Sequence, residues 1–310
     1  MSRVLLTGAD GFIGAPVAAR LVGAGHDVHG VCLRGREGEH GLTWHRADLL
    51  APETAEELVG SLRPELLVHL AWYTEHGRFW TSVENVRWVE ATLRLLRAFA
   101  SSGGRRAVLA GTCAEYEWTA QGGVLSEFAT PLRPRTLYGA GKDATREVAQ
   151  ALADHAGFEL AWGRVFFLYG PCEPETRLVP AVARALLAGL PAEVTDGAQI
   201  RDLLHVSDVA AAFQSLLESD VQGAVNIGSG EPVALREVIS LVGEAAGRPE
   251  LIRYGAAQGR PGEPAQLVAD VRRLREEVGF RPRVTLEDGI AGTVGWWRER
   301  LVAEAAASGR

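Results

Sequence analysis

Several features that define other classes of protein are missing from this sequence of 310 residues. It holds only three cysteines, Cys32, Cys113 and Cys172, and no two of them form a CxxC pair, so neither a disulfide framework nor a zinc site is indicated. Its eight histidines show no ligand spacing, and we predict no metal site. No apolar run approaches a length of about 20 residues, which a membrane-spanning helix needs.

The chain also lacks a block of basic residues. Its 32 lysine and arginine residues and 39 acidic residues are interspersed, for a net charge of −7, so nothing indicates a nucleic acid partner. A strand is expected at Val4–Thr7, which leaves no room for a signal peptide, and we expect a cytoplasmic protein without a membrane partner. The apolar share of 47% is that of an ordinary globular protein.

The first half of the chain alternates short aliphatic runs with helical patterns. Strands are expected at Val4–Thr7, Asp27–Leu33, Leu66–Leu70, Ala107–Ala110 and Glu159–Val165. Helices are expected at Phe12–Val22, Thr54–Leu62, Val83–Ser101 and Leu137–His155. This alternation predicts an α/β fold in which a doubly wound, parallel, Rossmann-like sheet occupies residues 1–170.

After Pro171, short helices and Gly/Pro-rich links replace this pattern. The helices are expected at Arg177–Ala188, Ser207–Glu218, Ala234–Ala246 and Leu286–Ala306. We therefore predict a smaller α+β lobe over residues 171–310 that closes over the carboxyl edge of the sheet. A further strand expected at Ala224–Ile227 suggests that residues 203–228 return to the first domain.

Three glycines, Gly8, Gly11 and Gly14, follow the first strand and open the first helix. The first permits a tight turn, the second lets the backbone approach a pyrophosphate, and the third permits close helix–strand packing, while the helix N-terminus faces the phosphates. The sequence therefore predicts a dinucleotide cofactor at this loop. The residues expected to contact it are Gly8, Asp10, Gly11, Phe12, Ile13, Gly14, Arg34, Asp48, Leu49, Leu70, Ala71, Tyr138 and Lys142.

The end of the second strand distinguishes the two nicotinamide cofactors. An acidic residue there would bond the 2′-hydroxyl of NAD, but this chain has Arg34 and Arg36. A guanidinium pairs with a 2′-phosphate, so NADP(H) is favoured and NAD(H) is the alternative, although both arginines could be ordinary loop residues. Asp48 is placed either to contact the adenine amino group or to cap a helix.

Tyr138 and Lys142 stand four residues apart, on one face of the fourth expected helix. A free phenol titrates at about pH 10, and an adjacent ammonium together with the positive charge of an oxidised nicotinamide would lower its pKa. Tyr138 would then exchange a proton during hydride transfer, while Lys142 supports the tyrosinate and holds the cofactor ribose. Thr112, at the end of the preceding strand, could hold the reacting carbonyl oxygen.

These elements closely resemble the extended short-chain dehydrogenase/reductase superfamily, in particular its nucleotide-sugar epimerase, dehydratase and reductase branch. The shared motifs are TGADGFIG from Thr7, YGAGK from Tyr138, FFLYGP from Phe166, RDLLHVSDV from Arg201 and GFRP from Gly279. The resemblance covers nearly the whole chain. It implies a Rossmann-like domain, a lobe that binds a nucleotide-diphosphate sugar, and a homodimer formed through helices.

The resemblance leaves several reactions open. Sugar 4,6-dehydratases of the superfamily carry Asp-Glu directly after the catalytic threonine, where this chain has Cys113 and Ala114, and Glu115 is one position out of phase. Epimerases need no such carboxylates but retain NAD, which Arg34 disfavours. We therefore predict an NADPH-dependent 4-ketoreductase of a nucleotide-linked 4-keto-6-deoxyhexose with Tyr138 as general acid. An NAD-dependent 4-epimerase or an atypical dehydratase is the alternative, and a non-catalytic NAD(P) sensor is a minor one.

Substrate contacts are expected from two regions. By resemblance, Arg201 and Arg260 should meet the nucleotide diphosphate, although Phe167 stands where the superfamily has an asparagine. An aromatic segment after the strand expected at Leu66–Leu70 should either shape the sugar pocket through Trp72 and Tyr73 or pack between the lobes.

Overall fold

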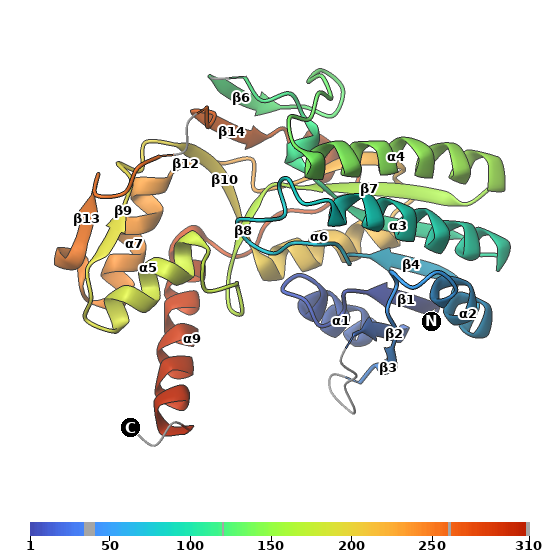
Figure 1. Cartoon of the computed structure of the whole chain (residues 1–310), viewed down its shortest axis with the longest axis horizontal. Coiled ribbons are helices and arrows are strands. Elements are labelled where there is room, and N and C mark those ends of the chain that lie inside the picture. Colours follow the sequence, from blue (N-terminus) through green and yellow to red (C-terminus); the bar gives the residue numbers. More distant parts are fainter. Residues whose placement is uncertain (34–40, 120, 260–261, 308–310) are drawn as a thin grey trace.

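The computed structural model describes residues 1–33, 41–119, 121–259 and 262–307. Its largest sheet is parallel throughout and runs in the order β11-β7-β5-β4-β1-β2-β3 (Figure 1). The strands of this sheet are β1 (Arg3–Thr7), β2 (Asp27–Cys32), β3 (Thr43–Arg46), β4 (Leu66–His69), β5 (Arg106–Thr112), β7 (Glu159–Val165) and β11 (Gly223–Ile227). Strands β4 and β5 are buried along their whole length, as expected of a parallel sheet covered on both faces.

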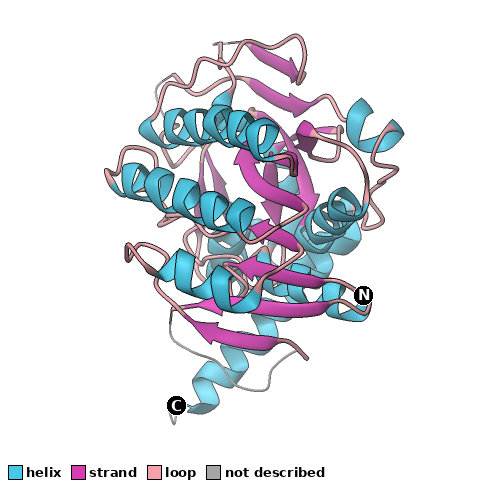
Figure 2. Cartoon of the chain, turned by 90° about the vertical axis from the view of Figure 1, so that its right-hand side faces the viewer, coloured by secondary structure: helices cyan, strands magenta, loops and turns pink. Residues whose placement is uncertain are grey.

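Helices cover the two faces of this sheet (Figure 2). On one face, α1 (Gly14–Gly23) and α6 (Val206–Glu218) share a hydrophobic core with the strands. On the other face, α2 (Thr54–Leu62), α3 (Glu84–Ser101) and α4 (Leu137–Ala156) share a second core. The sheet is therefore doubly wound, with its loops after each strand gathered at the carboxyl edge.

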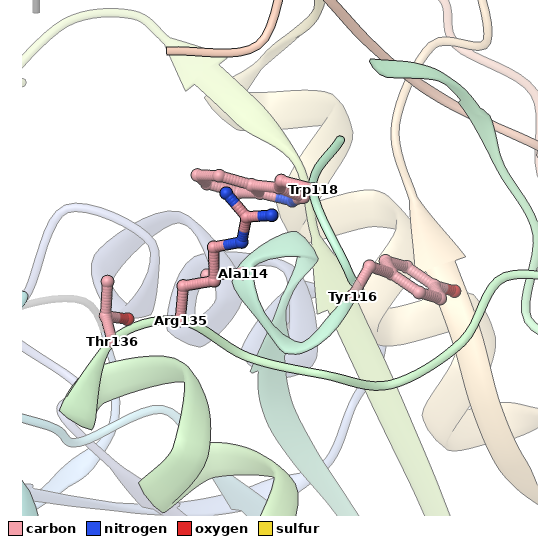
Figure 3. A pocket seen from close by; sticks show the side chains of 5 residues that line it. All are labelled: Ala114, Tyr116, Trp118, Arg135 and Thr136. Atoms are coloured by element: carbon pink, nitrogen blue, oxygen red, sulfur yellow. The ribbon is translucent and has the colours of Figure 1, made fainter. Parts of the chain in front are cut away.

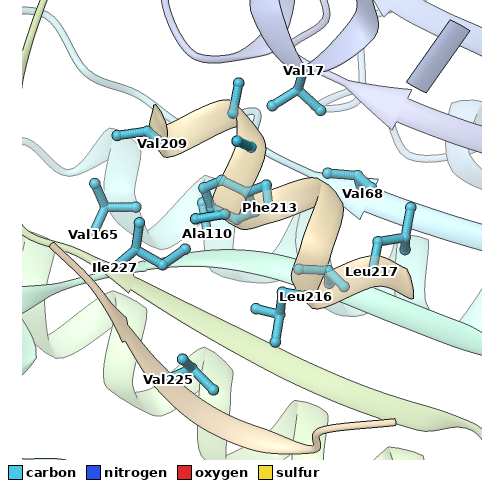
Figure 4. Close-up of a cluster of buried hydrophobic side chains, with 14 of the residues drawn as sticks. Val17, Val68, Ala110, Val165, Val209, Phe213, Leu216, Leu217, Val225 and Ile227 are labelled. Atoms are coloured by element: carbon cyan, nitrogen blue, oxygen red, sulfur yellow. The ribbon is translucent and has the colours of Figure 1, made fainter. Parts of the chain in front are cut away.

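The core under α6 joins segments that are far apart in the sequence. Phe213 of α6 packs over Gly163 of β7, where a Cβ would come within 3.1 Å of the Phe213 ring and 2.6 Å of Ile227. The side chains labelled around this helix in Figure 4 are Val17, Val68, Ala110, Val165, Val209, Phe213, Leu216, Leu217, Val225 and Ile227. This close packing fixes β11 beside β7, and β7 in turn pairs with β5, which carries Thr112 at its end.

A second group of elements, most of which follow β7, completes the structure. Elements β9, β13, α5, α7 and α9 lie to the left in Figure 1, and β6 and β14 lie at the top. A smaller sheet has the order β12-β10-β14-β6, with β8 also paired to β10, and β13 pairs with β9. The strands are β6 (Gly122–Leu125), β8 (Phe167–Tyr169), β9 (Ala192–Val194), β10 (Ile200–His205), β12 (Pro232–Ala234), β13 (Ile252–Tyr254) and β14 (Gln266–Ala269). The helices are α5 (Leu178–Leu187), α7 (Leu235–Ala246), α8 (Arg272–Glu276), α9 (Leu286–Ala307) and the 3₁₀ helices η1 (Cys113–Glu115) and η2 (Pro249–Leu251). Helices α5, α7 and α9 share a third core.

The α/β class and the Rossmann-like parallel sheet predicted from the sequence are confirmed. Each expected strand and helix is present with small differences at its ends, whereas strands β3, β6, β8 to β10 and β12 to β14 were not predicted. The expected strand Ala224–Ile227 is part of β11 and pairs with β7 in the large sheet. The division of the chain at residue 170 remains a prediction. No helix of the described ranges is long and apolar enough to cross a membrane.

Candidate active site

The loop between β1 and α1 is packed as tightly as its glycines predict. A Cβ on Gly14 would lie 1.8 Å from the carbonyl oxygen of Gly8, so only glycine fits there. Gly8 has φ +68° and lies against the backbone of Ala71, whose nitrogen would be 2.9 Å from an added Cβ. A Cβ on Gly11 would meet only the carbonyl oxygen of Gly8, at 3.1 Å. Among the described residues, the space outside the turn at Gly11 is therefore open.

This loop fits a dinucleotide pyrophosphate. Helix α1 has no acidic residue in its first turn, and no described side chain caps its N-terminus. Its first amides and its dipole therefore remain suited to an anion that approaches Gly11. Of the other predicted cofactor residues in this turn, Asp10 is exposed and Phe12 is half-buried, whereas Ile13 packs against the hydrophobic core, and their contact with a cofactor stays a prediction.

Leu70 and Ala71 follow β4 and close the neighbouring side of the loop. The amide of Leu70 donates to the carbonyl of Thr7 at 3.3 Å, and the amide of Ala71 donates to Oγ1 of Thr7 at the same distance. Asp48 is exposed and uses Oδ1 to accept from the amide of Leu50 at 3.0 Å, so it stabilises the turn before α2. Leu49 beside it is buried. Arg34 and Arg36 lie outside the described residues.

The structure brings Thr112 and Tyr138 together at the carboxyl end of β5. The side chain of Thr112 lies close enough to the phenol of Tyr138 to affect its pKa. Thr136 caps α4 by accepting from the amide of Gly139 at 3.1 Å, and the amide of Tyr138 donates to the carbonyl of Trp80 at 3.1 Å. A Cβ on Gly139 would lie 2.3 Å from the carbonyl oxygen of Ala114, so this glycine lets the first turn of α4 approach Thr112.

The sequence predicts that Lys142 helps to lower the pKa of Tyr138, but the protein groups alone raise it. Burial raises the pKa of Tyr138, while the Thr112 hydroxyl and the positive charge of Arg177 oppose that shift. Lys142 is instead occupied elsewhere, because its Nζ donates to the carbonyl of Ala110 at 2.7 Å. Among the described protein groups, Arg177 supplies the positive charge that acts on Tyr138, and it was not foreseen. The combined effect of Lys142 and an oxidised nicotinamide stays a prediction.

Lys142 is the only lysine in the chain, where every other strongly basic residue is arginine. Its side chain is 3% exposed, and its Nζ lies 3.8 Å from the ring centroid of Trp72. Burial lowers the pKa of Lys142 to about 7, and the carboxylate of Glu115 opposes the shift. The amine of Lys142 therefore gains and loses its proton near neutral pH.

Glu115 is the carboxylate nearest in sequence to Thr112, and it has a structural role. It accepts from the Thr112 amide at 2.8 Å, from Nε1 of Trp162 at 2.9 Å and from Nε of Arg164 at 2.6 Å. It is completely buried. Both oxygens of its carboxylate accept from these donors, so Glu115 is not available as an acid or base for a sugar.

The two positions between Thr112 and Glu115 offer no acid or base either. Cys113 is buried, and burial raises the pKa of its thiol to about 12. Ala114 has no titratable group. Because the thiol stays protonated at neutral pH and is a poor acid, the pair of carboxylates that an elimination of water requires is absent from these positions.

The aromatic segment after β4 is arranged differently from what the sequence predicts. Trp72 is buried against Lys142, and the Tyr73 hydroxyl donates to Oε2 of Glu75 at 2.7 Å. The rings that face Tyr138 are those of Phe79 and Trp80, whose centroids lie 4.9 Å and 5.8 Å from its own in edge-on contacts. These two residues were missed, although the aromatic composition of the segment was a signal.

A third ring extends this aromatic wall. Trp118 lies 6.1 Å from Trp80 and lines a small cavity beside the N-terminus of α4 (Figure 3). The cavity is lined by Ala114, Tyr116, Trp118, Arg135 and Thr136. Ala114 and Thr136 stand two residues from Thr112 and Tyr138, respectively, in the sequence, and neither Thr112 nor Tyr138 lines the cavity.

Arg201 is buried rather than open to a ligand. Its Nη2 donates to Oε1 of Glu263 at 2.7 Å, its Nη1 donates to the carbonyl of Ile200 at 2.8 Å, and its guanidinium lies over the Phe167 ring. The prediction that Arg201 meets a diphosphate therefore requires the Glu263 carboxylate to give way. Arg260 lies outside the described residues.

Two charged residues near the site were not predicted. Arg177, at the start of α5, lies 5.5 Å from the Phe79 ring centroid and acts on Tyr138. Glu173 is buried four residues earlier, and burial raises its pKa to about 8. Neither belongs to a recognisable motif, because both depend on how the loop after β8 folds back. Among the described residues no cluster of three or more His, Cys, Asp or Glu could hold a metal.

Comparisons with known proteins agree with this geometry. A family model described as the NAD dependent epimerase/dehydratase family matches residues 4–228. The chain is 28% identical to the UDP-glucose 4-epimerase of Mycolicibacterium smegmatis over 96% of this chain and 99% of that protein. It is 27% identical to the dTDP-glucose 4,6-dehydratase of Streptomyces griseus, over 96% and 94%.

A solved structure shows the same arrangement of elements. MoeE5 in complex with UDP-glucose and NAD is 33% identical to this chain, with a TM-score of 0.83 and coverage of 96% of this chain and 99% of that one. The family model covers most of the chain, and the resemblance to the extended short-chain dehydrogenase/reductase superfamily is confirmed. The chain belongs to the NAD dependent epimerase/dehydratase family and is an NAD-dependent enzyme of the nucleotide-sugar type.

Proposed function

We propose that this enzyme is an NAD-dependent 4-epimerase of a nucleoside-diphosphate hexose, with UDP-glucose as the first substrate to test. The observation that carries the proposal is the approach of Thr112 to Tyr138, together with Cys113 and Ala114 directly after Thr112 in the sequence. Thr112 and Tyr138 can serve hydride transfer at a sugar carbon, but nothing beside them can remove water from the sugar. A relative of similar length is a UDP-glucose 4-epimerase, and the MoeE5 structure holds UDP-glucose and NAD.

The chain supplies binding, orientation and proton transfer. Gly8, Gly11 and Gly14 would hold the pyrophosphate of NAD, which when bound supplies reversible acceptance of hydride from C4 of the sugar. Tyr138 takes the proton of the C4 hydroxyl as the C4–H bond of the sugar breaks. It returns that proton when hydride comes back to the opposite face of C4. Thr112 holds the same oxygen and so restrains the keto form that arises between the two transfers.

The rings around Tyr138 suit a sugar. Phe79 and Trp80 present faces and edges on which the C–H groups of a hexose can pack, and they keep water from the keto form. Arg177 adds a positive charge that favours the tyrosinate needed to accept the hydroxyl proton. We propose these three residues as parts of the site in addition to those predicted from the sequence.

The reductase predicted from the sequence becomes the second candidate. It rested on Arg34 and Arg36, which lie outside the described residues, and on the absent dehydratase carboxylates, which an epimerase lacks as well. The comparisons support NAD and give no support for NADP. The epimerase therefore accounts for the same site residues together with the cofactor of the family.

The test is to denature the purified protein, identify any released nucleotide, and titrate the stripped protein with NADH and NADPH. An epimerase should release bound NAD or NADH, because it reuses the cofactor in every cycle. An empty protein with a clear preference for NADPH would instead support the ketoreductase, and Arg34 would be the first residue to change.

We also propose that two copies associate through the outer faces of α3 and α4. Val86 on α3 and Val148 on α4 are 48% and 51% exposed, and Val83 before α3 is 71% exposed. Light scattering after size exclusion should give the mass of a dimer, and Val86→Arg should give that of a monomer. A monomeric wild-type protein would remove the proposal.

A further inference from the structure

Trp72 is the residue that lies against the only lysine. The Nζ of Lys142 sits 3.8 Å from the centroid of the Trp72 ring and donates one hydrogen bond, to Ala110. A cation placed over an indole face is attracted by the ring quadrupole, most strongly where water is excluded. Both side chains are buried, so water screens the attraction between the ammonium and the indole only weakly.

The orientation of the indole is itself fixed. Nε1 of Trp72 donates to Oδ1 of Asn85 at 2.8 Å, and Asn85 is completely buried at the start of α3. The amide nitrogen of Asn85 donates to the carbonyls of Phe79 at 2.7 Å and Ser82 at 2.8 Å. One buried network therefore orients the ring under Lys142 and anchors the loop whose rings contact Tyr138.

The charged groups around Lys142 do not replace this contact. Glu115 approaches from η1, but its carboxylate is paired with Arg164. His69 approaches from β4, where burial and the charge of Lys142 lower its pKa to about 3, so it is neutral. Its ring nitrogens are occupied by Thr7 and Thr92. The nearest compensation for the buried ammonium is therefore the carbonyl of Ala110 and the indole of Trp72.

We infer that Trp72 is a positioning residue, whose indole face keeps the amine of Lys142 charged and directed into the active site. Its importance for turnover rests on the proposed function and on the role predicted for Lys142 from the sequence, which is to support Tyr138 and hold the cofactor ribose. The electrostatic effect itself can be measured without any substrate. Trp72 therefore acts through Lys142 and was predicted from the sequence for a different purpose.

The single lysine makes the measurement unambiguous. Incorporation of ¹³C-labelled lysine into the full chain, made without a lysine-containing tag, labels residue 142 alone. The ¹³Cε shift followed from pH 5 to pH 10 should titrate near 7 in the wild type, because burial lowers the pKa of Lys142 to about 7. Loss of the ring in Trp72→Leu should move the midpoint down by about one unit, since a desolvated cation–π contact is worth about that much.

Two variants separate the ring from general packing. Trp72→Phe keeps an aromatic face and should titrate within about half a unit of the wild type. Trp88→Leu removes a neighbouring indole, 6.3 Å from Trp72, and should leave the midpoint unchanged. An unchanged midpoint in Trp72→Leu, or an equal shift in Trp88→Leu, would overturn the inference.

Fluorinated tryptophans at position 72 test the same idea if Trp72→Leu fails to fold. Each added fluorine weakens the negative ring face while the shape of the indole is nearly kept, so the midpoint should fall stepwise. A midpoint that does not change along the series would overturn the inference. A normal titration in a protein that fails to epimerise any sugar would count against the proposed function only.

Discussion

Nε of Arg164 donates to Oε2 of Glu115 across 2.6 Å, and both side chains are buried. The same carboxylate also accepts from the backbone amide of Thr112, so it fixes the end of β5 where the proposed catalytic threonine stands. This relationship explains how a glutamate three residues after Thr112 is present without being a catalytic base. It links the stability of the central sheet to the geometry of the site.

Removal of that charge should be costly. Glu115→Gln leaves the buried guanidinium of Arg164 without its counter-charge, and we expect a loss of about 3–5 kcal/mol in the free energy of unfolding. Urea denaturation followed by circular dichroism measures it. Glu117→Gln is the matched control, because Glu117 pairs at 3.6 Å with the exposed Arg133 and should cost less than about 1 kcal/mol. Equal effects of the two variants would contradict the structural role.

Tyr138→Phe should lower the rate of hydride transfer by about 10²–10⁴-fold, because the proton acceptor is lost. Binding of NAD should change little, since the phenol is not part of the glycine loop. Stopped-flow absorbance at 340 nm and calorimetry measure the two effects. Tyr254→Phe, in β13, removes a hydroxyl that bonds the carbonyl of Arg236 and serves as control. Retention of the wild-type rate by Tyr138→Phe would contradict the assignment.

Gly14→Ala should reduce NAD affinity by at least about tenfold. Its added Cβ would lie 1.8 Å from the carbonyl oxygen of Gly8, so the turn must open. Gly23→Ala, at the end of the same helix, meets nothing within 4 Å among the described residues and should bind NAD as the wild type does. Calorimetric titration of both variants provides the comparison. Normal affinity in Gly14→Ala would show that the turn does not hold the cofactor.

Glu173 should make stability depend on pH. Burial raises its pKa from 4.5 to about 8, so ionisation is disfavoured in the folded state. Its destabilising effect is therefore absent below about pH 4.5, grows as pH rises, and is complete above about pH 8. Glu173→Gln removes it, and its melting temperature should exceed that of the wild type by at least about 2 °C at pH 8, with little difference at pH 4.5.

Melting temperatures between pH 4.5 and pH 9 test this prediction. Glu175→Gln changes an exposed carboxylate that pairs with Arg184, and should show no such pH-dependent gain. A Glu173→Gln protein that is less stable than the wild type at pH 8 would show that the ionised carboxylate is favoured, for instance by Arg177.

The sequence was most informative where function depends on local spacing. Gly8, Gly11 and Gly14 act within one turn, and Tyr138 and Lys142 lie within one turn of a helix. Their spacing can therefore be recognised in the sequence before the fold is known. The long buried strands were also predictable, because a sheet covered on both faces requires continuous aliphatic runs.

Contacts between distant segments were not predictable in this way. Phe79 and Trp80 reach Tyr138 because Asn85 anchors their loop, and Arg177 arrives from the loop after β8. The direction of the Tyr138 pKa depends on burial, which no local pattern shows. Short strands such as β12 (Pro232–Ala234) have too few residues to give a periodic signal.

The most direct test of the central claim uses UDP-[4-²H]glucose with the purified enzyme and NAD, followed by ¹H NMR. The proposed 4-epimerase should form UDP-galactose that retains deuterium at C4, with no net change in NADH, because hydride leaves and returns within one active site. Absence of any 4-epimer, together with oxidation of NADPH by a nucleotide-linked 4-keto sugar, would contradict the claim and identify a ketoreductase.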